Sequence, residues 1–486
     1  MPRWNSPEKR TASIHILDDD SLLHVFFLYR PFLLGEDQDD TARLWGGRGG
    51  WVRGRWWYEL AHVCQRWRTI ILGSASYLDL SLVCTNGTPV ADMLAHSPPL
   101  PLVVDYLENA DKPDITAEDE EGIILALTGK QRDRVCRVRL CVSFTKLQRI
   151  IVVMDDEYQN LEYLIIMHRD KDNNVVSVFP ETLQAPHLRH VALKGFALPM
   201  GSRFLTTAVG LVTLCLGMDN LSTYFHPNTL LQWLSFMPEL QTLLFTFSIP
   251  VPNHDVRWQL AHTPITTPVT LPNLRHLTFQ GVSTYLEALV HWVTAPRLEK
   301  LEIIFFAQLT FFVPRVPQLL NTAENLRFDS AKFIFSDEGV GVAVYPHEAA
   351  EMYPLAILVK CWELDWQLSS MAQISNSLSQ TFSAVEHLTF QHEEHIRAFE
   401  IHNEIDPTEW RKLLRSFRNV KTLRIDDGFI EELSRCLELD NGELSLELLP
   451  ELKELTYSGN DDTDDAFTSF IDARHNAGRP ISLVRP

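Results

Sequence analysis

One short apolar frame recurs along most of this chain and limits the folds that the chain can adopt. It reads apolar, two variable residues, apolar, one variable residue, apolar, as in Leu274-Arg275-His276-Leu277-Thr278-Phe279. A chance alternation predicts a single strand, whereas the same six-position frame returning many times predicts a repeat architecture. The first apolar residues of the eleven copies are Val135, Leu161, Leu188, Leu211, Leu240, Leu274, Leu298, Leu326, Val385, Val420 and Leu452.

The spacing of the frames indicates one strand and one helix in each unit. The frames begin 23 to 35 residues apart, except for an interval of 59 residues after Leu326, which predicts a hidden unit near Leu355 to Leu358. The last two apolar residues of each frame point to one face of a short strand. Stretches between frames, such as 230–234 and 285–292, have helical spacing. Because one strand and one helix cannot bury their apolar faces alone, we predict stacked α/β units with a parallel sheet on the concave face.

The two ends of such a sheet need covers, because parallel strands leave unpaired backbone groups at each edge. Residues 100–106 predict the first strand, and the acidic run 461–465 with the tail after it is expected to close the other end. The repeating frame resembles that of leucine-rich repeats. This resemblance implies an irregular leucine-rich-repeat-like solenoid over residues 76–486, whose subclass stays open because no asparagine or cysteine ladder follows the strands.

Two apolar helical segments precede the repeats. Residues 18–30 predict a short helix that begins at three aspartates and stops at Pro31. Residues 56–72 predict a second helix that ends at Gly73, with an apolar stripe made of Leu60, Val63, Cys64, Trp67, Ile70 and Ile71. Two short helices cannot bury this apolar area between themselves, so either the rest of the chain or another protein must cover it.

Two further segments show no helical or strand period. Residues 1–13 are expected to be a disordered amino terminus, and residues 35–55, which are rich in acidic residues and then in Gly, Arg and Trp, are expected to be a flexible loop. Arginines with nearby aromatic rings can also bind RNA. This leaves open an RNA-associated protein that uses Arg48, Arg53, Arg55 and the adjacent tryptophans.

The helical segments resemble an F-box. The stretch from Leu17 to Tyr29 is similar to the opening of that motif, and Val63-Cys64-Gln65-Arg66-Trp67-Arg68-Thr69-Ile70 is similar to its second signature. The arrangement resembles F-box proteins of mushroom-forming fungi. It implies a helical F-box domain at 14–75, with the loop 35–55 inserted, that binds a Skp-type adaptor and through it a cullin and a RING subunit. The implied adaptor-binding residues are Leu17, Leu22, Val25, Phe26, Val63, Cys64, Trp67 and Ile70.

The repeats are expected to present a binding face for an unknown target protein. In each strand, the variable residues beside the inward apolar pair point to the concave side. This gives a mixed polar strip whose target-binding candidates are His276, Thr278, Gln280, Lys300, Glu302, His387, Gln391 and Arg424. The resemblance therefore implies a substrate receptor of an SCF-type ubiquitin ligase. The alternatives left open are a non-ligase repeat scaffold, which the departures of Asp18 and Ser21 from the F-box pattern favour, and a solenoid without a binding role.

Composition narrows the partners and the compartment. The 486 residues carry a formal net charge of −20, which argues against nucleic acid and against an anionic membrane as partners. Seven cysteines, an odd number, make no disulfide framework, so we expect a reducing compartment, cytoplasmic or nuclear. The most apolar run, 301–313, is too short to span a bilayer.

The search for an active site predicts no enzyme, no cofactor and no metal. Residues 392–395 read His-Glu-Glu-His, but the histidine spacing differs from that of zinc proteases. Cys64 lies on an apolar stripe, where it packs as a small hydrophobe. No serine lies in a nucleophile elbow, and paired carboxylates are too common in so acidic a chain to indicate general acid–base chemistry.

Overall fold

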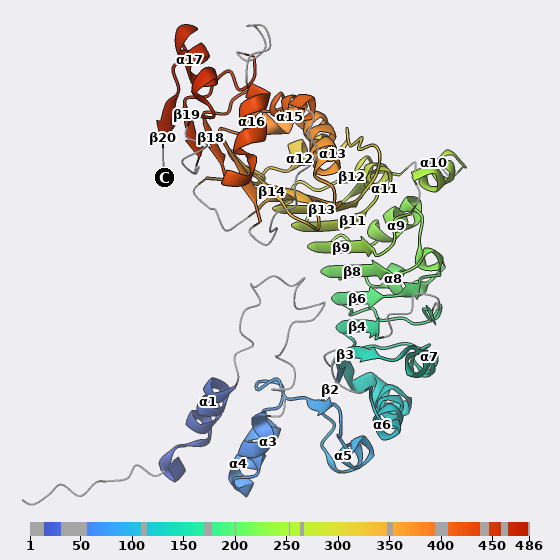
Figure 1. Ribbon diagram of the computed structural model, residues 1–486. Coiled ribbons are helices and arrows are strands. Elements are labelled where there is room, and N and C mark those ends of the chain that lie inside the picture. The colour runs from blue at the N-terminus through green and yellow to red at the C-terminus, as the bar shows by residue number, and fades with distance from the viewer. Residues whose placement is uncertain are drawn as a thin grey trace, which may run out of the picture. The chain divides into compact units, whose positions relative to one another are not determined.

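The computed structural model describes residues 14–30, 56–107, 114–169, 177–199, 201–251, 253–262, 267–347, 353–393, 407–437, 447–457 and 465–484. The chain divides into two compact units, Met1–Asp170 and Lys171–Pro486 (Figure 1). The division falls inside the predicted solenoid, so the helical segments and the first strands belong to one unit. The predicted disordered segment 1–13, the loop 35–55 and most of the acidic run 461–465 lie outside the described residues.

The first unit is a set of short helices followed by a parallel sheet. Its described strands run in the order β1-β2-β3-β4. The predicted helix at 18–30 is confirmed as α1. The elements are η1 (Ile14–Ile16), α1 (Asp19–Tyr29), α3 (Trp56–Ala61), α4 (Gln65–Gly73), β1 (Leu82–Cys84), α5 (Val90–His96), β2 (Leu102–Tyr106), α6 (Ala117–Leu127), η3 (Gly129–Arg134), β3 (Val135–Val142), α7 (Phe144–Val153) and β4 (Tyr163–His168).

The sheet of this unit begins one strand earlier than predicted. The strand expected at 100–106 is present as β2, but β1 precedes it and pairs with it in parallel, Leu82 opposite Leu102. With three residues, β1 is too short to show a period in the sequence. Helix α6 between β2 and β3 begins with a capping box, in which the Thr116 and Asp119 side chains bind each other's backbone amides.

The second unit continues the alternation of strands and helices. Its main sheet runs in the order β6-β8-β9-β11-β13-β16-β15-β14-β17-β18-β19-β20, and two short pairs, β5 with β7 and β10 with β12, stand apart from it. Its first elements are β5 (Ser177–Val178), β6 (His190–Lys194), β7 (Phe196–Ala197), α8 (Arg203–Thr207), β8 (Thr213–Met218), η4 (Leu221–Thr223), α9 (Pro227–Leu234), β9 (Thr242–Phe247), α10 (Asn253–His262), β10 (Val269–Thr270), β11 (His276–Gly281), α11 (Ser283–Val290), β12 (Val293–Thr294) and β13 (Lys300–Phe306).

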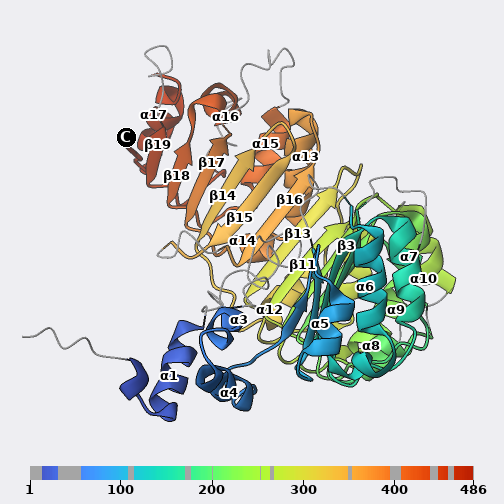
Figure 2. The ribbon, with the colours of Figure 1, turned by 90° about the horizontal axis from the view of Figure 1, so that it is seen from below.

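The same pattern extends towards the carboxyl terminus. Figure 2 shows the strands of this part of the sheet in the order β13-β16-β15-β14-β17-β18-β19. The elements are α12 (Val316–Thr322), β14 (Ser330–Phe335), β15 (Val340–Tyr345), β16 (Leu355–Lys360), α13 (Leu364–Ser377), α14 (Ser379–Phe382), β17 (His387–His392), α15 (Pro407–Leu414), β18 (Thr422–Ile425), η5 (Asp427–Phe429), α16 (Ile430–Leu437), β19 (Glu454–Tyr457), α17 (Thr468–Asn476) and β20 (Ser482–Val484).

Ten of the eleven predicted frames coincide with a strand, which confirms a mixed α/β architecture with a mainly parallel sheet. The frame placed at Leu326 is wrong in register, because β14 begins only at Ser330. Strand β11, for example, begins two residues after the first apolar residue of its frame, Leu274. Its Leu277 and Phe279 are buried, whereas Thr278 and Gln280 are half-buried. This alternation arises because successive side chains of a strand point to opposite faces. The buried face packs on the helices, as the contact between Phe279 and Tyr285 of α11 shows.

The sheet is not parallel throughout, which corrects one prediction. Strand β15 is antiparallel to both β14 and β16, so the long interval after Leu326 contains three strands. The hidden unit near Leu355–Leu358 is strand β16, and it pairs with β13 out of sequence order. The turn between β14 and β15 packs tightly, because a Cβ at Gly339 would lie 2.2 Å from the Val359 carbonyl oxygen. A repeat period carries no information on strand direction, so the sequence did not reveal the hairpin.

Candidate protein-interaction sites

Helices α1 and α4 of the first unit pack on each other through an aromatic contact. The Phe26 ring meets the Trp67 ring edge-on, with centroids 4.9 Å apart, and Leu22 and Phe26 are 0% and 1% exposed. Asp18 precedes α1 as its N-cap, and its carboxylate accepts a hydrogen bond of 2.7 Å from the Ser21 amide. The residues that depart from the F-box pattern therefore cap this helix.

The second predicted helix, 56–72, is two helices, which corrects that prediction. Helix α3 ends at Ala61 and α4 begins at Gln65, because Cys64 has an extended backbone conformation. Neither proline nor glycine lies at this break, so the sequence carried no local signal for it. The turn that results exposes 58% of Val63.

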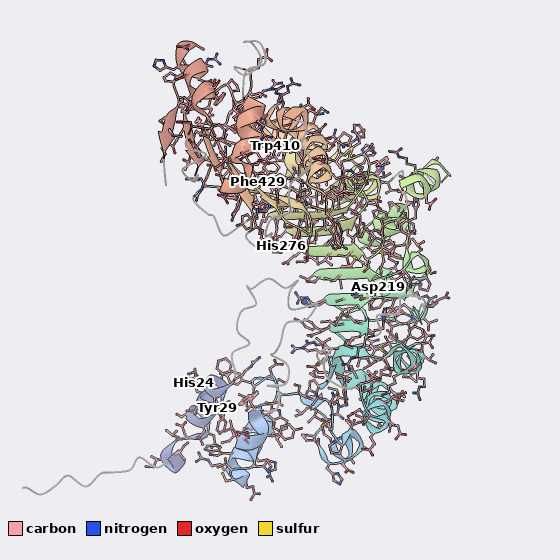
Figure 3. The ribbon with its side chains drawn as sticks, viewed as in Figure 1. His24, Tyr29, Asp219, His276, Trp410 and Phe429 are labelled. Carbon is pink, nitrogen blue, oxygen red and sulfur yellow. The ribbon has the colours of Figure 1, made fainter. Side chains whose placement is uncertain are left out.

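The predicted adaptor-binding residues divide into a surface set and a core set. Leu17, Val25 and Val63 are exposed, and Cys64, Trp67 and Ile70 are half-buried. Leu22 and Phe26 are buried between the helices, so they stabilise the helical pair and offer no surface to a partner. Further exposed apolar side chains in this region were not predicted as site residues, namely Ile16, Phe27, Leu28, Tyr29 and Tyr77. We call the exposed side chains of Ile16, Leu17, Val25, Leu28, Tyr29 and Val63 the N-terminal apolar surface; Figure 3 labels Tyr29 and His24 on α1.

Polar and aromatic contacts fix the helices to the start of the sheet in the same unit. Arg30, which follows α1, pairs with Asp79 at 2.9 Å, and the indole nitrogen of Trp57 in α3 donates to the Ser81 carbonyl at 3.2 Å. The rings of Phe27 and Tyr77 lie 5.2 Å apart. These contacts hold the carboxyl-terminal end of α1 and the amino-terminal end of α3, and they leave the side chains of Val25 and Val63 exposed.

The predicted target-binding residues lie on the face of the second unit's sheet that the helices leave open, in two groups. His276 lies opposite Lys300, and Thr278 lies opposite Glu302, on the adjacent strands β11 and β13; Gln280 follows on β11. His276 is exposed, as labelled in Figure 3, and the other members of this group are half-buried. Lys300 and Glu302 also form an ion pair of 3.9 Å.

The second group lies on β17 and β18. His387 faces Thr422 and bonds its hydroxyl at 2.7 Å, whereas Arg424 faces Thr389 and is exposed. Gln391 lies nearer the end of β17. The ring of His347, which sequence reasoning missed, stacks on His387 with centroids 4.3 Å apart.

Strands β16, β15 and β14 lie between the two groups and change the chemistry of the face. The registers place Gln280, Ile304, Leu358, Gly341, Ile334 and Gln391 in one row across the sheet. All six are half-buried, so along this row the open face has an apolar centre with a polar residue on each side. In the adjacent row, Lys332 of β14 lies between Ala343 and Thr389. The order of these strands, β13-β16-β15-β14-β17, was not predicted, so the apolar centre that they form together could not be predicted either.

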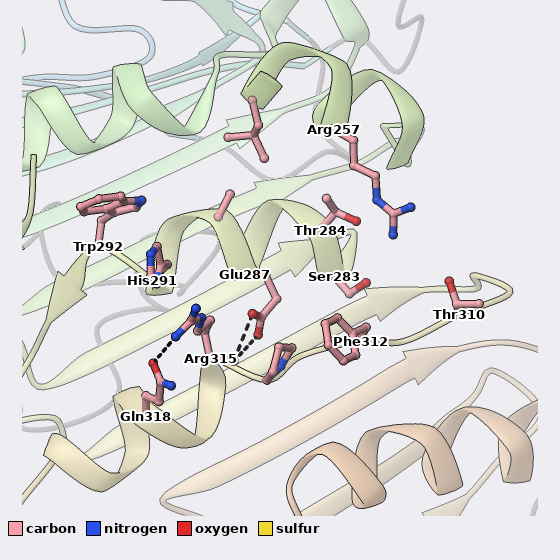
Figure 4. Close-up of a pocket in the computed structure, with 13 residues that line it drawn as sticks. Arg257, Ser283, Thr284, Glu287, His291, Trp292, Thr310, Phe312, Arg315 and Gln318 are labelled. Atoms are coloured by element: carbon pink, nitrogen blue, oxygen red, sulfur yellow. Dashed lines mark hydrogen bonds between the residues drawn. The ribbon is translucent and has the colours of Figure 1, made fainter. Parts of the chain in front are cut away.

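A separate pocket lies between α11 and α12 of the second unit (Figure 4). It has a volume of about 660 Å³ and is lined by Arg257, Ser283, Glu287, His291, Phe312 and Arg315, among others. The Glu287 carboxylate accepts the backbone amides of Arg315, at 3.0 Å to each oxygen, and of Val316 at 3.3 Å. It therefore caps the amino terminus of α12.

The pocket carboxylate has an unusual acidity. Burial raises the pKa of Glu287 to about 7, although the amides of Arg315 and Val316 favour the charged form. The carboxyl therefore binds a proton more readily in the folded than in the unfolded chain, and folding stability falls as pH rises from about 4.5 to about 7. We expect Glu287→Gln to remove this fall in folding stability, which amounts to about 1–3 kcal/mol over that pH range. The measurement is the free energy of unfolding in denaturant at several pH values, with Glu324→Gln, at an exposed position, as the control. If E287Q keeps the pH profile of the wild type, Glu287 is not the source of the pH dependence.

The described residues contain no group of three His, Cys, Asp or Glu side chains that could hold a metal ion. Of the histidine cluster at 392–395, only His392 and Glu393 are described, and His402 is outside the described residues. No described helix has the length and apolarity that crossing a bilayer requires.

These features define an α/β repeat protein with a mainly parallel sheet. No protein-family model matches the sequence, and no curated protein matches it. A solved structure that resembles the chain is that of the leucine-rich repeat-containing protein LegL7 from Legionella pneumophila, with 8% sequence identity, a TM-score of 0.25, and coverage of 80% of this chain and 97% of that chain. This likeness is too low to carry an argument about function, and the F-box resemblance of residues 17–70 stays a prediction.

Proposed function

We propose that this protein is a substrate receptor of an SCF-type ubiquitin ligase, in which the N-terminal helices bind a Skp-type adaptor and the repeats bind a target protein. The observation that carries the adaptor half is the N-terminal apolar surface. Ile16, Leu28 and Val63 are 80%, 61% and 58% exposed within one short helical region. Many exposed apolar side chains in one helical region are typical of a protein-interaction surface.

The receptor would act by proximity. The adaptor would connect this chain to the cullin and RING subunits, and the repeats would hold a target protein near the ubiquitin-loaded enzyme. Holding two reactants together raises their effective concentration, so the receptor itself needs no catalytic group. The open face of the second unit supports the target-binding half, because its apolar centre with polar flanks has the composition of an interface.

The proposal is tested by co-purification with a Skp-type adaptor. The double variant Val25→Glu and Val63→Glu should weaken the complex by at least about tenfold, because each substitution places a charge in the docking surface. Val152→Glu is the matched control, since Val152 is a 75% exposed valine on α7 of the same unit. Phe26→Ala and Trp67→Ala are unsuitable as sole tests because both rings pack between α1 and α4.

A second candidate is a repeat scaffold that binds proteins without assembling a ligase. The use of Asp18 and Ser21 as a helix cap favours it, because these positions depart from the F-box pattern. A wild-type chain that forms no complex with the adaptor, or a complex that the Val25 and Val63 substitutions leave unchanged, contradicts the receptor proposal. Partners recovered without the adaptor would then support the scaffold.

A further inference from the structure

Two exposed tryptophans stand at the carboxyl end of strand β16, outside the predicted target-binding strip. Trp362 is 85% exposed and Trp366, at the start of α13, is 50% exposed. Tryptophan is a costly residue to leave in water, and it is the side chain most enriched among the residues that dominate protein interfaces. Leu309, 82% exposed, follows the neighbouring strand β13 at the same edge of the sheet.

Four carboxylates lie on the tryptophan segment and on the turn beside it. Glu363 and Asp365 adjoin them in the sequence, and Asp337 and Glu338 form the turn between β14 and β15; all four are exposed. The buried Gln367 joins the two segments, because its side-chain nitrogen donates to the carbonyls of Ser336 at 2.7 Å and Cys361 at 2.9 Å. The turn and the tryptophan segment are therefore immediate neighbours. We call Trp362, Trp366 and these four acids the tryptophan edge.

The charges of the tryptophan edge have only a partial role in the fold. Asp365 lies in the first turn of α13, where a carboxylate stabilises the helix. Asp337 and Glu338 have no comparable role, and none of the four acids forms an ion pair in the described part of the chain. Lys360 is the nearby exposed cation. The patch therefore carries a local excess of negative charge beside two indole faces.

We propose that the tryptophan edge binds a basic, Lys- or Arg-bearing segment of a target protein. The carboxylates attract the cations and repel acidic proteins, nucleic acid and anionic lipid. The indole rings add cation–π contacts and apolar area for the stems of Lys and Arg. The proposal rests on the proposed role of the repeats in binding a target protein and specifies the chemistry of that target. It does not depend on adaptor binding by the N-terminal helices.

The test selects short peptides from a random displayed library on the full-length wild-type chain, without adaptor. The recovered peptides should be enriched in Lys and Arg. The double variant Trp362→Ala and Trp366→Ala should bind them at least about tenfold more weakly in fluorescence anisotropy, because the rings supply the contact area. Asp337→Asn with Glu338→Gln should also weaken binding and make it less dependent on salt.

Matched controls separate this site from the general acidity of the chain. Phe236→Ala removes another exposed ring, 41% exposed, and Glu324→Gln with Asp472→Asn removes two exposed acids elsewhere in the same unit; neither should change binding. The Val25 and Val63 substitutions should leave peptide binding unchanged. A failure of the proposed adaptor binding would therefore not contradict the proposal for the tryptophan edge.

Four results would overturn the proposal. They are the recovery of no peptide, recovered peptides that are not enriched in Lys and Arg, peptides that bind the double tryptophan variant as tightly as the wild type, and a wild-type chain that self-associates in sedimentation through these tryptophans. The last result would assign the tryptophan edge to a second copy of the chain. Circular dichroism of the variants checks that they fold.

Discussion

Replacing Trp410 by alanine should lower the free energy of unfolding by about 3–5 kcal/mol. Trp410 of α15 is 0% exposed and is surrounded by the rings of Phe335, Phe390 and Phe429, at centroid distances of 5.9, 5.3 and 5.7 Å. Figure 3 labels Trp410 and Phe429. Alanine would leave a cavity among these rings, which belong to different strands and helices and cannot collapse together. The measurement is denaturant unfolding followed by circular dichroism.

The matched control for this prediction is Trp362→Ala. The same side chain is removed, but at 85% exposure it makes little buried contact, and the change should stay within about 0.5 kcal/mol. If both variants lose a similar free energy of unfolding, packing of Trp410 between β14, β17 and α15 does not stabilise the core as predicted. Hydrogen exchange should locate the loss at β14 and β17, because Phe335 and Phe390 lie on those strands.

The second large effect is expected at a buried ion pair in the first unit. Asp105 of β2 and Arg139 of β3 lie opposite each other in the sheet, are each 6% exposed, and approach to 3.5 Å. Asp105→Leu should cost about 3–5 kcal/mol, because the guanidinium stays buried, loses the Asp105 charge and cannot release its proton. The double variant Asp105→Leu with Arg139→Met should recover most of that loss.

The reverse single variant should depend on pH. Burial raises the pKa of Asp105, and Arg139 opposes that rise. In Arg139→Met the carboxyl loses its partner and its pKa rises further, so the folded chain holds a proton that the unfolded chain has lost. Its stability should therefore fall as pH rises above about 4, where the carboxyl of the unfolded chain loses its proton. Denaturant unfolding measured over a series of pH values tests this; a double variant as unstable as Asp105→Leu would contradict the pairing.

The repeating frame predicted the strands well because it records a local requirement. A residue such as Leu277 or Phe279 must be apolar if its face of the strand is buried on helices, and this requirement recurs wherever the unit recurs. The start of helix α1 was predictable for the same reason, because Asp18 caps it through contacts within three residues.

The errors lie where contacts between distant segments decide the structure. The separation of α3 from α4 and the burial of Phe26 depend on how these helices pack, which a helical stripe alone does not specify. The tryptophan edge exists because Gln367 holds the β14–β15 turn beside Trp362, and no local pattern joins those segments.

The sequence alone determined the alternation of strand and helix, the buried side of each strand and the capped first helix. Neighbouring residues decide these features, because they set the local conformation and the face of the element on which the apolar side chains lie. Only the tertiary structure decided the antiparallel hairpin, the apolar centre of the open face and which apolar side chains of the N-terminal helices remain on the surface. Strand direction and final exposure depend on segments far apart in the chain, since burial is a property of the assembled neighbours and not of the residue itself.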